Sequence, residues 1–355
     1  MERLERGRQA CGFAKNKKGG WLMKNFKWEK ALVLGLVVGM FLLQASLGTC
    51  AEDKGYPRKS ITIIEPWGAQ SWGFLQAQEL AAALEPLMGQ RIIVQAKSGG
   101  ASGVGTKIVK ESRPDGYTLL HAWIAGFVMV PLQEANPGYN VFEDFEFLAY
   151  FTESPVVAIS RSDKPWNTLA QMVEYIRLNP NKNFAFSGGP ALSIHSLCGG
   201  EVFHNAGVKV KGIFYDDAAA AGASMLAGDT DVAMDSFGTL RKYGDQVKII
   251  GVFGDHRYPG FENVATVAEQ GLKAPTVRSW SGIVAPKGLP AGVRNKLSQA
   301  LKQVLTNKDF QDKIWKNMQW FVVYKDPEGF KEMVKVSLDQ MKAPIQRMKE
   351  RQQAK

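Results

Sequence analysis

Residues 61–80 read ITIIEPWGAQSWGFLQAQEL. The apolar run Ile61 to Ile64 has the length of a buried strand, and a loop separates it from an amphipathic run of helical length, Leu75 to Leu87. The alternation continues through three further runs: Ile92 to Val94, Gly105 to Glu111 and Tyr117 to His121. Strands that alternate with helices predict βαβ units, in which a parallel sheet is covered by helices on both faces.

The same alternation returns after Pro165. Its runs are Leu169 to Leu178, Phe184 to Phe186, His195 to His204, Lys211 to Phe214, Ala218 to Ala227 and Val232 to Met234. A chain with about 300 residues beyond its N-terminal segment is long enough for two domains of ordinary size. The pattern therefore predicts two α/β domains in series, followed by amphipathic basic helices over Gly292 to Leu305 and Pro327 to Met348.

The N-terminal segment has the pattern of a secretory signal. Ala31 to Leu47 carries no charge, and lysines precede it. The run is too short, and too soon followed by polar sequence, to favour a permanent membrane span. We expect export, with residues 1–51 as leader and signal peptide. Cleavage after Ala51 is favoured over lipidation at Cys50, and Met23 is an alternative start.

The net positive charge lies mostly in the leader. The sequence holds 44 Lys and Arg against 34 Asp and Glu, a formal charge of +10. Nine of the basic and three of the acidic residues lie in residues 1–30, so 35 basic and 31 acidic residues remain from Glu52 onward. Because a polyanion partner needs clustered positive charge, this mild excess argues against nucleic-acid binding.

The cysteines give no sign of a disulfide or of catalysis. Cys11 and Cys50 lie in or near the leader, which leaves Cys198 as the single thiol of the mature chain. Cys198 lies in a helical stretch, where a buried, unreactive cysteine is the common state. We therefore predict that Cys198 packs in the core.

Four strand-to-helix loops hold the candidate binding residues: 65–74, 98–103, 121–123 and 187–195. In open α/β sheets a ligand binds at the carboxyl ends of the strands, where such loops lie. Small residues before a helix leave backbone N–H groups free, and the helix dipole favours a negative group there. The loops predict a site in which backbone amides hold an anion, although each loop alone also fits an ordinary turn with an N-cap serine.

Several short motifs follow one another in a fixed order. The most specific are Thr266-Val267-Ala268-Glu269-Gln270-Gly271-Leu272, then Trp280 with Gly282 to Gly288, and Pro114-Asp115-Gly116-Tyr117-Thr118. Weaker matches include the Gly-rich turn Gly99 to Gly105 and Ser187-Gly188-Gly189. Together, over residues 56 to 350, these motifs resemble the extracytoplasmic solute receptors of tripartite tricarboxylate transporters, the Bug-type receptors.

This resemblance implies a periplasmic-binding-protein fold, of class α/β, with two α/β domains joined by a two-strand hinge and a ligand cleft between them. Domain 1 is expected to be discontinuous, residues 56–155 plus 281–355, and domain 2 to be residues 156–280. The expected hinge strands are Val156 to Ser160 and Ser281 to Ala285.

The resemblance also implies a function of capture instead of catalysis. The protein is expected to bind a small organic carboxylate in the periplasm and deliver it to membrane components of a transporter. It is expected to be a monomer and to need neither a cofactor nor a metal. An alternative within the same kind of receptor is that it presents its ligand to a membrane sensor kinase.

Ligand-binding residues follow from the family's use of the first and fourth loops, largely through main-chain amides and waters. Carried over, the resemblance implicates Gly68, Ala69, Ser71, Ser187, Gly188 and Ser193. Further candidates near the same strand ends are Trp67, Gln70, Trp72, Phe74, Ser102, Trp123, His195 and Asp235. For His195 a capping or packing role fits the sequence equally well.

The first loop departs from the family pattern. Members usually have a Gly-Gly pair, a small or polar residue and then Asp, where this chain has Gln70-Ser71-Trp72-Gly73-Phe74. Phe74 in place of Asp removes a partner for a ligand ammonium group. The aromatic side chains Trp67, Trp72, Phe74 and Trp123 suit an aromatic or apolar carboxylate, or else they pack the loop.

A nucleotide hydrolase fits only part of the sequence. Gly100 and Gly105 have the spacing that opens a phosphate-binding loop. The chain continues Thr106-Lys107, which reverses the order that such a loop requires.

A serine hydrolase and a metal site also lack support. A triad would draw on Ser102 or Ser187, with His195 and Asp235, but neither serine lies in a Gly-x-Ser-x-Gly turn. No two of the four histidines form a close pair on a helix face, so no metal-ligand spacing is present.

Overall fold

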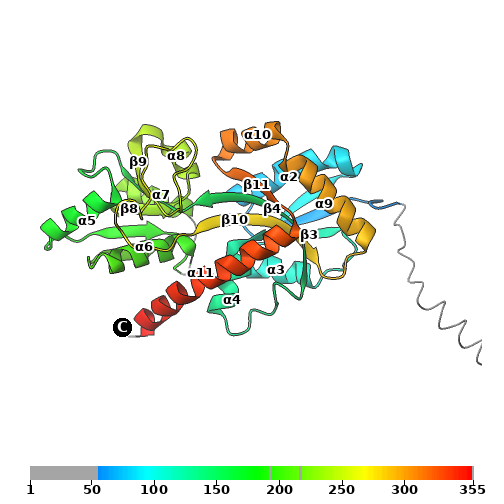
Figure 1. Cartoon of the computed structure of the whole chain (residues 1–355), viewed down its shortest axis with the longest axis horizontal. Coiled ribbons are helices and arrows are strands. Elements are labelled where there is room, and N and C mark those ends of the chain that lie inside the picture. Colours follow the sequence, from blue (N-terminus) through cyan, green and yellow to red (C-terminus); the bar gives the residue numbers. More distant parts are fainter. Residues whose placement is uncertain (1–54, 192, 216–217, 354–355) are drawn as a thin grey trace, which may run out of the picture. The chain divides into compact units, whose positions relative to one another are not determined.

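The computed structural model describes residues 55–191, 193–215 and 218–353. The expectations of a signal sequence, of cleavage after Ala51, of lipidation at Cys50 and of a start at Met23 lie outside these residues, as does Cys11. Across the described ranges, no helix combines the length and the apolar character needed to cross a bilayer. The described part contains two β-sheets with helices packed on them (Figure 1).

The first sheet combines parallel and antiparallel pairs. Its strand order is β11-β4-β10-β3-β1-β2. The bounds are β1 Ile61–Glu65, β2 Ile92–Ala96, β3 Thr118–Trp123, β4 Phe145–Pro155, β10 Arg278–Pro286 and β11 Phe321–Lys325. β1 is parallel to β2 and β3, whereas β10 is antiparallel to β3 and β4, and β11 is antiparallel to β4.

The second sheet is also mixed, with the order β7-β6-β8-β5-β9. Its strands are β5 Val157–Arg161, β6 Ala185–Gly188, β7 Lys211–Phe214, β8 Val232–Asp235 and β9 Val247–Val252. β6 is parallel to β7 and β8, and β5 is antiparallel to β8 and β9.

The expectation of parallel sheets is therefore wrong for part of each sheet, and the path of the chain explains why. The chain leaves the first sheet along β4, with only Val156 between Pro155 and the start of β5, and it returns along β10. Two neighbouring strands that carry the chain out and back run in opposite directions, so they pair antiparallel. Their register places Ser281 opposite Thr152.

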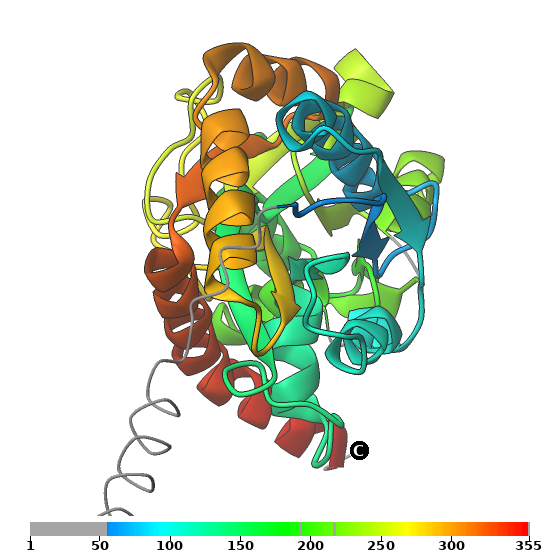
Figure 2. The same ribbon diagram turned by 90° about the vertical axis from the view of Figure 1, so that its right-hand side faces the viewer.

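Helices cover both faces of the first sheet. On one face lie α2 Trp72–Met88, α9 Ala291–Leu305 and α10 Lys308–Met318 (Figure 2), and on the other α3 Gly103–Lys110, α4 Val130–Gln133 and α11 Pro327–Gln353 (Figure 1). In α2 the buried residues Ala77, Leu80 and Leu84 recur at helical spacing and face the sheet. The helix ends where Gly89 adopts a left-handed conformation with φ of 68°.

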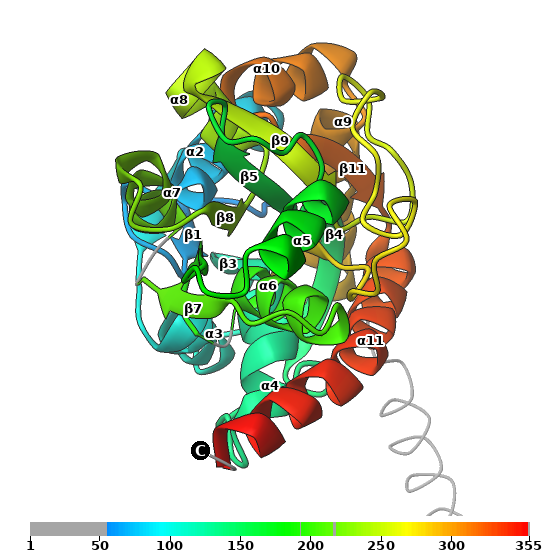
Figure 3. The ribbon, with the colours of Figure 1, turned by 90° about the vertical axis from the view of Figure 1, so that its left-hand side faces the viewer.

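The second sheet is covered by α5 Leu169–Leu178 and α6 Ile194–Asn205 on one face, and by α7 Ala218–Ala227 and α8 Gly238–Tyr243 on the other (Figure 3). Cys198 lies in α6 with no exposed surface, and burial raises the pKa of its thiol well above the usual range. The prediction of a buried, packed cysteine is confirmed.

Polar contacts tie a loop of the second sheet to the two strands that carry the chain between the sheets. Arg278, the first residue of β10, contacts Glu153 of β4 at 3.1 Å and Asp255, beyond β9, at 3.0 Å. The N–H of Phe253 donates to the carbonyl of Val156 at 2.8 Å. The crossing strands and the loop after β9 are therefore bonded together at one place.

Candidate functional site

The first loop, between β1 and α2, exposes backbone at the start of a helix. Gly68, Ala69 and Gln70 are exposed, and the loop is closed by a hydrogen bond from the N–H of Ser71 to the carbonyl of Gly68 at 2.9 Å. Ser71 is the N-cap of α2, and its Oγ accepts from the N–H of Phe74 at 3.1 Å. The earlier N–H groups of the first turn have no acceptor within the helix, so this end of α2 can hold an anion.

The fourth loop, between β6 and α6, repeats this arrangement. Ser193 is the N-cap of α6, and its Oγ accepts from the N–H of Ser196 at 3.3 Å. Ser187 is fully buried, and its Oγ donates to the carbonyl of Ala221 at 2.9 Å. Gly188 is the buried last residue of β6. The side chain of Ser187 is therefore committed to the interior, and its main chain is what it can offer to a ligand.

The second loop carries unusual backbone. Residues 99–102 all have positive φ, including the non-glycine residues Ala101 at 48° and Ser102 at 76°. Ser102 is fully buried, and within the described ranges its Oγ has no hydrogen-bond partner. An ideal Cβ on Gly126 would lie 2.7 Å from that Oγ, so the hydroxyl points to the backbone after β3. Strained backbone of this kind is found at ligand sites.

The aromatic candidates divide into packed and partly accessible rings. Trp123 is only 6% exposed and packs edge-to-face on Trp320, with centroids 5.5 Å apart. Trp67 and Trp72 are half-buried and pack on the same core. Phe74 is half-buried as well. Trp123 is therefore a core residue, and an aromatic contact to a ligand can come only from the other three rings.

Trp72 also lies against the start of α8, the helix between β8 and β9 of the second sheet. An ideal Cβ on Gly238, the first residue of α8, would lie 3.3 Å from both Cε2 and Nε1 of Trp72. Asp235, at the end of β8, accepts from the N–H of Ser236 at 2.7 Å and from the hydroxyl of Thr239. Asp235 thus orders the start of α8, and the absence of a side chain at Gly238 lets the indole approach.

The residues of the hypothetical hydrolase triad do not assemble. Asp235 bonds within its own turn, and the hydroxyl of Ser187 is engaged by Ala221 and by Thr230 at 3.0 Å. The Nε2 atom of His195 is buried and has no hydrogen-bond partner in the described part of the chain. Within the described ranges, the contacts of Ser187, His195 and Asp235 do not join these three residues in the way that a triad requires.

His195 should make the protein less stable in mild acid. Burial lowers the pKa of its imidazole to about 4, from 6.5. Between pH 6.5 and pH 4, His195 is protonated in the unfolded chain but stays neutral in the folded protein. The free energy of unfolding therefore falls as the pH falls, by about 2 kcal/mol at pH 4.5. Urea unfolding at pH 7 and pH 4.5 should show that the free energy of unfolding falls less between these pH values for His195→Leu than for the unaltered protein. His204→Leu, at an exposed position of the same helix, should leave the loss unchanged.

A polar pair that the sequence reasoning missed lies directly beneath the first loop. Glu65, the last residue of β1, and His121 of β3 are fully buried, and Glu65 Oε2 lies 2.5 Å from His121 Nδ1. Each is the one ionisable residue of a mainly apolar strand, Glu65 at the end of ITIIE in β1 and His121 within TLLHAW in β3. One ionisable residue on each of two neighbouring strands was the available signal.

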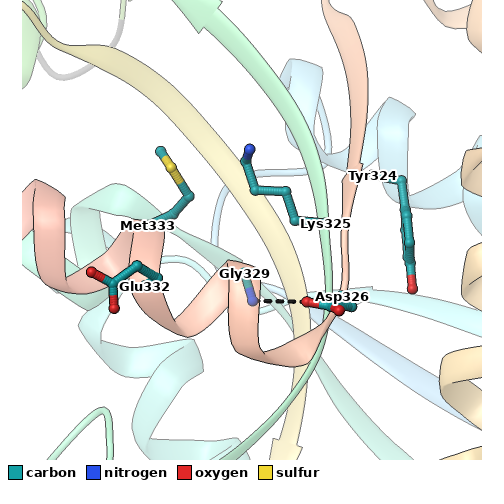
Figure 4. Close-up of a pocket in the computed structure, with 6 residues that line it drawn as sticks. All are labelled: Tyr324, Lys325, Asp326, Gly329, Glu332 and Met333. Carbon is teal, nitrogen blue, oxygen red and sulfur yellow. Dashed lines mark hydrogen bonds between the residues drawn. The ribbon is translucent and has the colours of Figure 1, made fainter.

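A hollow of about 490 Å³ lies elsewhere, at the turn between β11 and α11 (Figure 4). It is lined by Tyr324, Lys325, Asp326, Gly329, Glu332 and Met333. Asp326 accepts from the N–H of Gly329 at 2.8 Å and so caps the first turn of α11. None of the predicted binding residues lines this hollow, which we interpret as a surface feature of that turn.

Two mixed sheets, crossing strands and helix N-termini at the strand ends define the chain as a periplasmic-binding-protein fold. Solved structures support this class. The periplasmic binding protein BugD is 27% identical, with a TM-score of 0.71 over 82% of this chain and 98% of that chain. An R. palustris protein solved with adipate has the same fold, at 20% identity and a TM-score of 0.74 over 82% of this chain and 97% of that chain.

The chain belongs to the tripartite tricarboxylate transporter receptor family, TctC, whose model matches residues 76–349. A UPF0065 protein of Agrobacterium vitis, encoded in the TAR-I ttuE-ttuC′ intergenic region, is 30% identical over 72% of this chain and 73% of its own length. The family is one of solute receptors, so a small-molecule ligand and a membrane transporter as partner follow from membership.

Proposed function

We propose that this protein is a periplasmic receptor that captures a small organic carboxylate and delivers it to the membrane components of a tripartite transporter. The observation that carries the proposal is the exposed loop Gly68 to Gln70, which leads into N–H groups at the start of α2 that have no acceptor within the helix. An oxyanion can bind these groups without an arginine. The R. palustris protein of the same fold was solved with adipate, a dicarboxylate.

The proposed contacts come from both sheets. From the first loop they are Gly68, Ala69, Gln70, Ser71 and the rings of Trp67, Trp72 and Phe74; from the fourth they are the main chain of Ser187, Gly188 and Ser193. We propose that residues 56–155 plus 281–355 and residues 156–280 move as two domains about β4–β5 and β10. A ligand held by one domain then gains contacts to the other and shifts the population toward a closed form.

A thermal-shift panel tests the function. The folded protein is heated with acetate, succinate, malate, adipate, citrate or benzoate, and separately with the neutral amides succinamide and benzamide. A ligand at about 100 times its Kd adds about 2.7 kcal/mol to the free energy of unfolding, so a true ligand raises the melting temperature by several degrees. We expect a shift from at least one carboxylate and none from the amides. If no carboxylate in the panel raised the melting temperature, the proposed function would be wrong.

A further inference from the structure

The buried pair of Glu65 and His121 is an unusual feature for the interior of this sheet. Both side chains have no exposed surface, and their close contact joins β1 to β3. The indole N–H of Trp123 lies 3.5 Å from the same carboxylate oxygen. Among the described residues, Glu65 Oε1 and His121 Nε2 have no hydrogen-bond partner. A buried acid–imidazole pair costs desolvation that two apolar residues avoid, so it contributes little net stability.

The free oxygen of Glu65 lies against the first turn of α2. An ideal Cβ on Gly73 would stand 2.6 Å from Glu65 Oε1 and 2.8 Å from Trp123 Cζ2. Only a glycine lets the carboxylate come this close to the helix backbone. The exposed loop Gly68 to Gln70 reaches the same turn from the solvent side.

Anions on both sides of this turn interact with the same helix dipole. The N-terminus of a helix carries a partial positive charge that attracts an anion. The carboxylate of Glu65 faces that charge from the interior, and a ligand carboxylate held by the loop faces it from outside. Two negative charges several ångströms apart, at the effective dielectric constant of about 20 that suits such sites, repel enough to weaken ligand binding by roughly tenfold or more.

We propose that His121 is a specificity-determining residue because it balances the charge of Glu65 and so leaves the dipole of α2 available to an anionic ligand. An imidazole that carries its proton on Nδ1 donates a hydrogen bond to Glu65 Oε2 and so offsets the charge of that carboxylate. The proposal rests on the proposed carboxylate function and adds a residue to it that does not touch the ligand. His121 and Glu65 act through the helix terminus and are positioning residues in that sense.

A binding cycle tests the proposal. Glu65→Gln, His121→Gln and the double variant are titrated by calorimetry with the panel carboxylate that gives the largest thermal shift. We expect His121→Gln to weaken binding about tenfold, since it leaves the carboxylate unbalanced. Glu65→Gln should bind at least as tightly as the unaltered protein. The double variant, which is uncharged at both positions, should return to within about threefold of it.

Two controls separate charge from general disturbance. Glu201→Gln changes another fully buried glutamate, which α11 engages through Arg347 at 2.6 Å, and it should leave the affinity unchanged. Raising the salt concentration should reduce the difference in ligand affinity between His121→Gln and the double variant, since salt screens charge effects and leaves packing effects unchanged. If both single variants lost affinity equally and the double variant lost more, the pair would contribute only through packing, and the proposal would be overturned.

The remaining outcomes distinguish failure of the role of the pair from failure of the carboxylate function. If His121→Gln does not fold, Glu65→Gln carries the test alone, and a loss of more than tenfold in its affinity overturns the proposal. If neither the unaltered protein nor Glu65→Gln binds any panel carboxylate, the carboxylate function fails and the proposal fails with it. If the unaltered protein binds and the cycle shows no charge effect, only the role of the pair is lost.

Discussion

Replacing Gly188 with valine should abolish carboxylate binding and lower the melting temperature of the free protein by roughly 5 °C or more. Gly188 is buried at the end of β6, and an added Cβ would lie 2.6 Å from the Oγ and 3.2 Å from the Cα of Ser196. Ser196 belongs to the first turn of α6, so the new side chain displaces the helix terminus that we propose to contact the ligand. Overpacking of this kind costs about 1–3 kcal/mol.

Because Gly188 is buried, the substitution is expected to affect stability as well as binding. The measurement is the melting temperature with and without the best panel carboxylate. Gly200→Val is the matched control, because nothing lies within 4 Å of a Cβ at that position of α6. Gly68→Val probes the first loop without a clash, since it also has open space. A folded Gly188→Val that binds normally would exclude the fourth loop from the site.

Amino acids should bind at least a hundredfold more weakly than the corresponding carboxylates without an amino group. Phe74 offers apolar area and only a weak attraction for a cation, so a ligand ammonium group would be buried without a partner, at a cost of several kcal/mol. The carboxylate of Glu65, which lies close to Gly73 in the first turn of α2, is fully buried. Calorimetry with succinate against aspartate, and with glutarate against glutamate, checks this.

Phe74→Asp should invert the preference by weakening the best carboxylate and improving the amino acid. Phe74→Leu is the control, because it keeps an apolar group and should leave amino acids excluded. The difference between Phe74→Leu and the unaltered protein measures what the aromatic ring contributes to binding. Tight binding of aspartate or glutamate to the unaltered protein would refute the prediction.

Much of the secondary structure followed from the pattern of apolar residues. The runs Leu169 to Leu178, Lys211 to Phe214 and Ala218 to Ala227 coincide with α5, β7 and α7. The sequence reasoning missed β4, because FEFLAYFTESP is almost wholly buried and shows no alternation of apolar and polar residues. The α10–β11 segment was missed as well; all five residues of β11 are only partly buried.

The candidate site was predicted as far as local sequence can define it. N-cap serines at Ser71 and Ser193 are local signals, and both cap the expected helices. The contact of Glu65 with His121 spans 56 residues, so only the pairing of β1 with β3 brings it about. Likewise, the interior direction of Trp123 depends on which face of β3 meets α2, and an aromatic residue at a strand end looks the same on either face.

The contact between Trp72 and Gly238 has an evolutionary consequence. The two positions are 166 residues apart, yet the indole atoms lie 3.3 Å from where a Cβ on Gly238 would stand. A methyl group gained at 238 would also lie 3.2 Å from the carbonyl oxygen of Met318, so it is accommodated more readily when a side chain smaller than tryptophan stands at 72. Across relatives of this chain, the residues aligned with 72 and 238 should therefore covary inversely in size, with large rings opposite glycine and smaller side chains opposite alanine or serine.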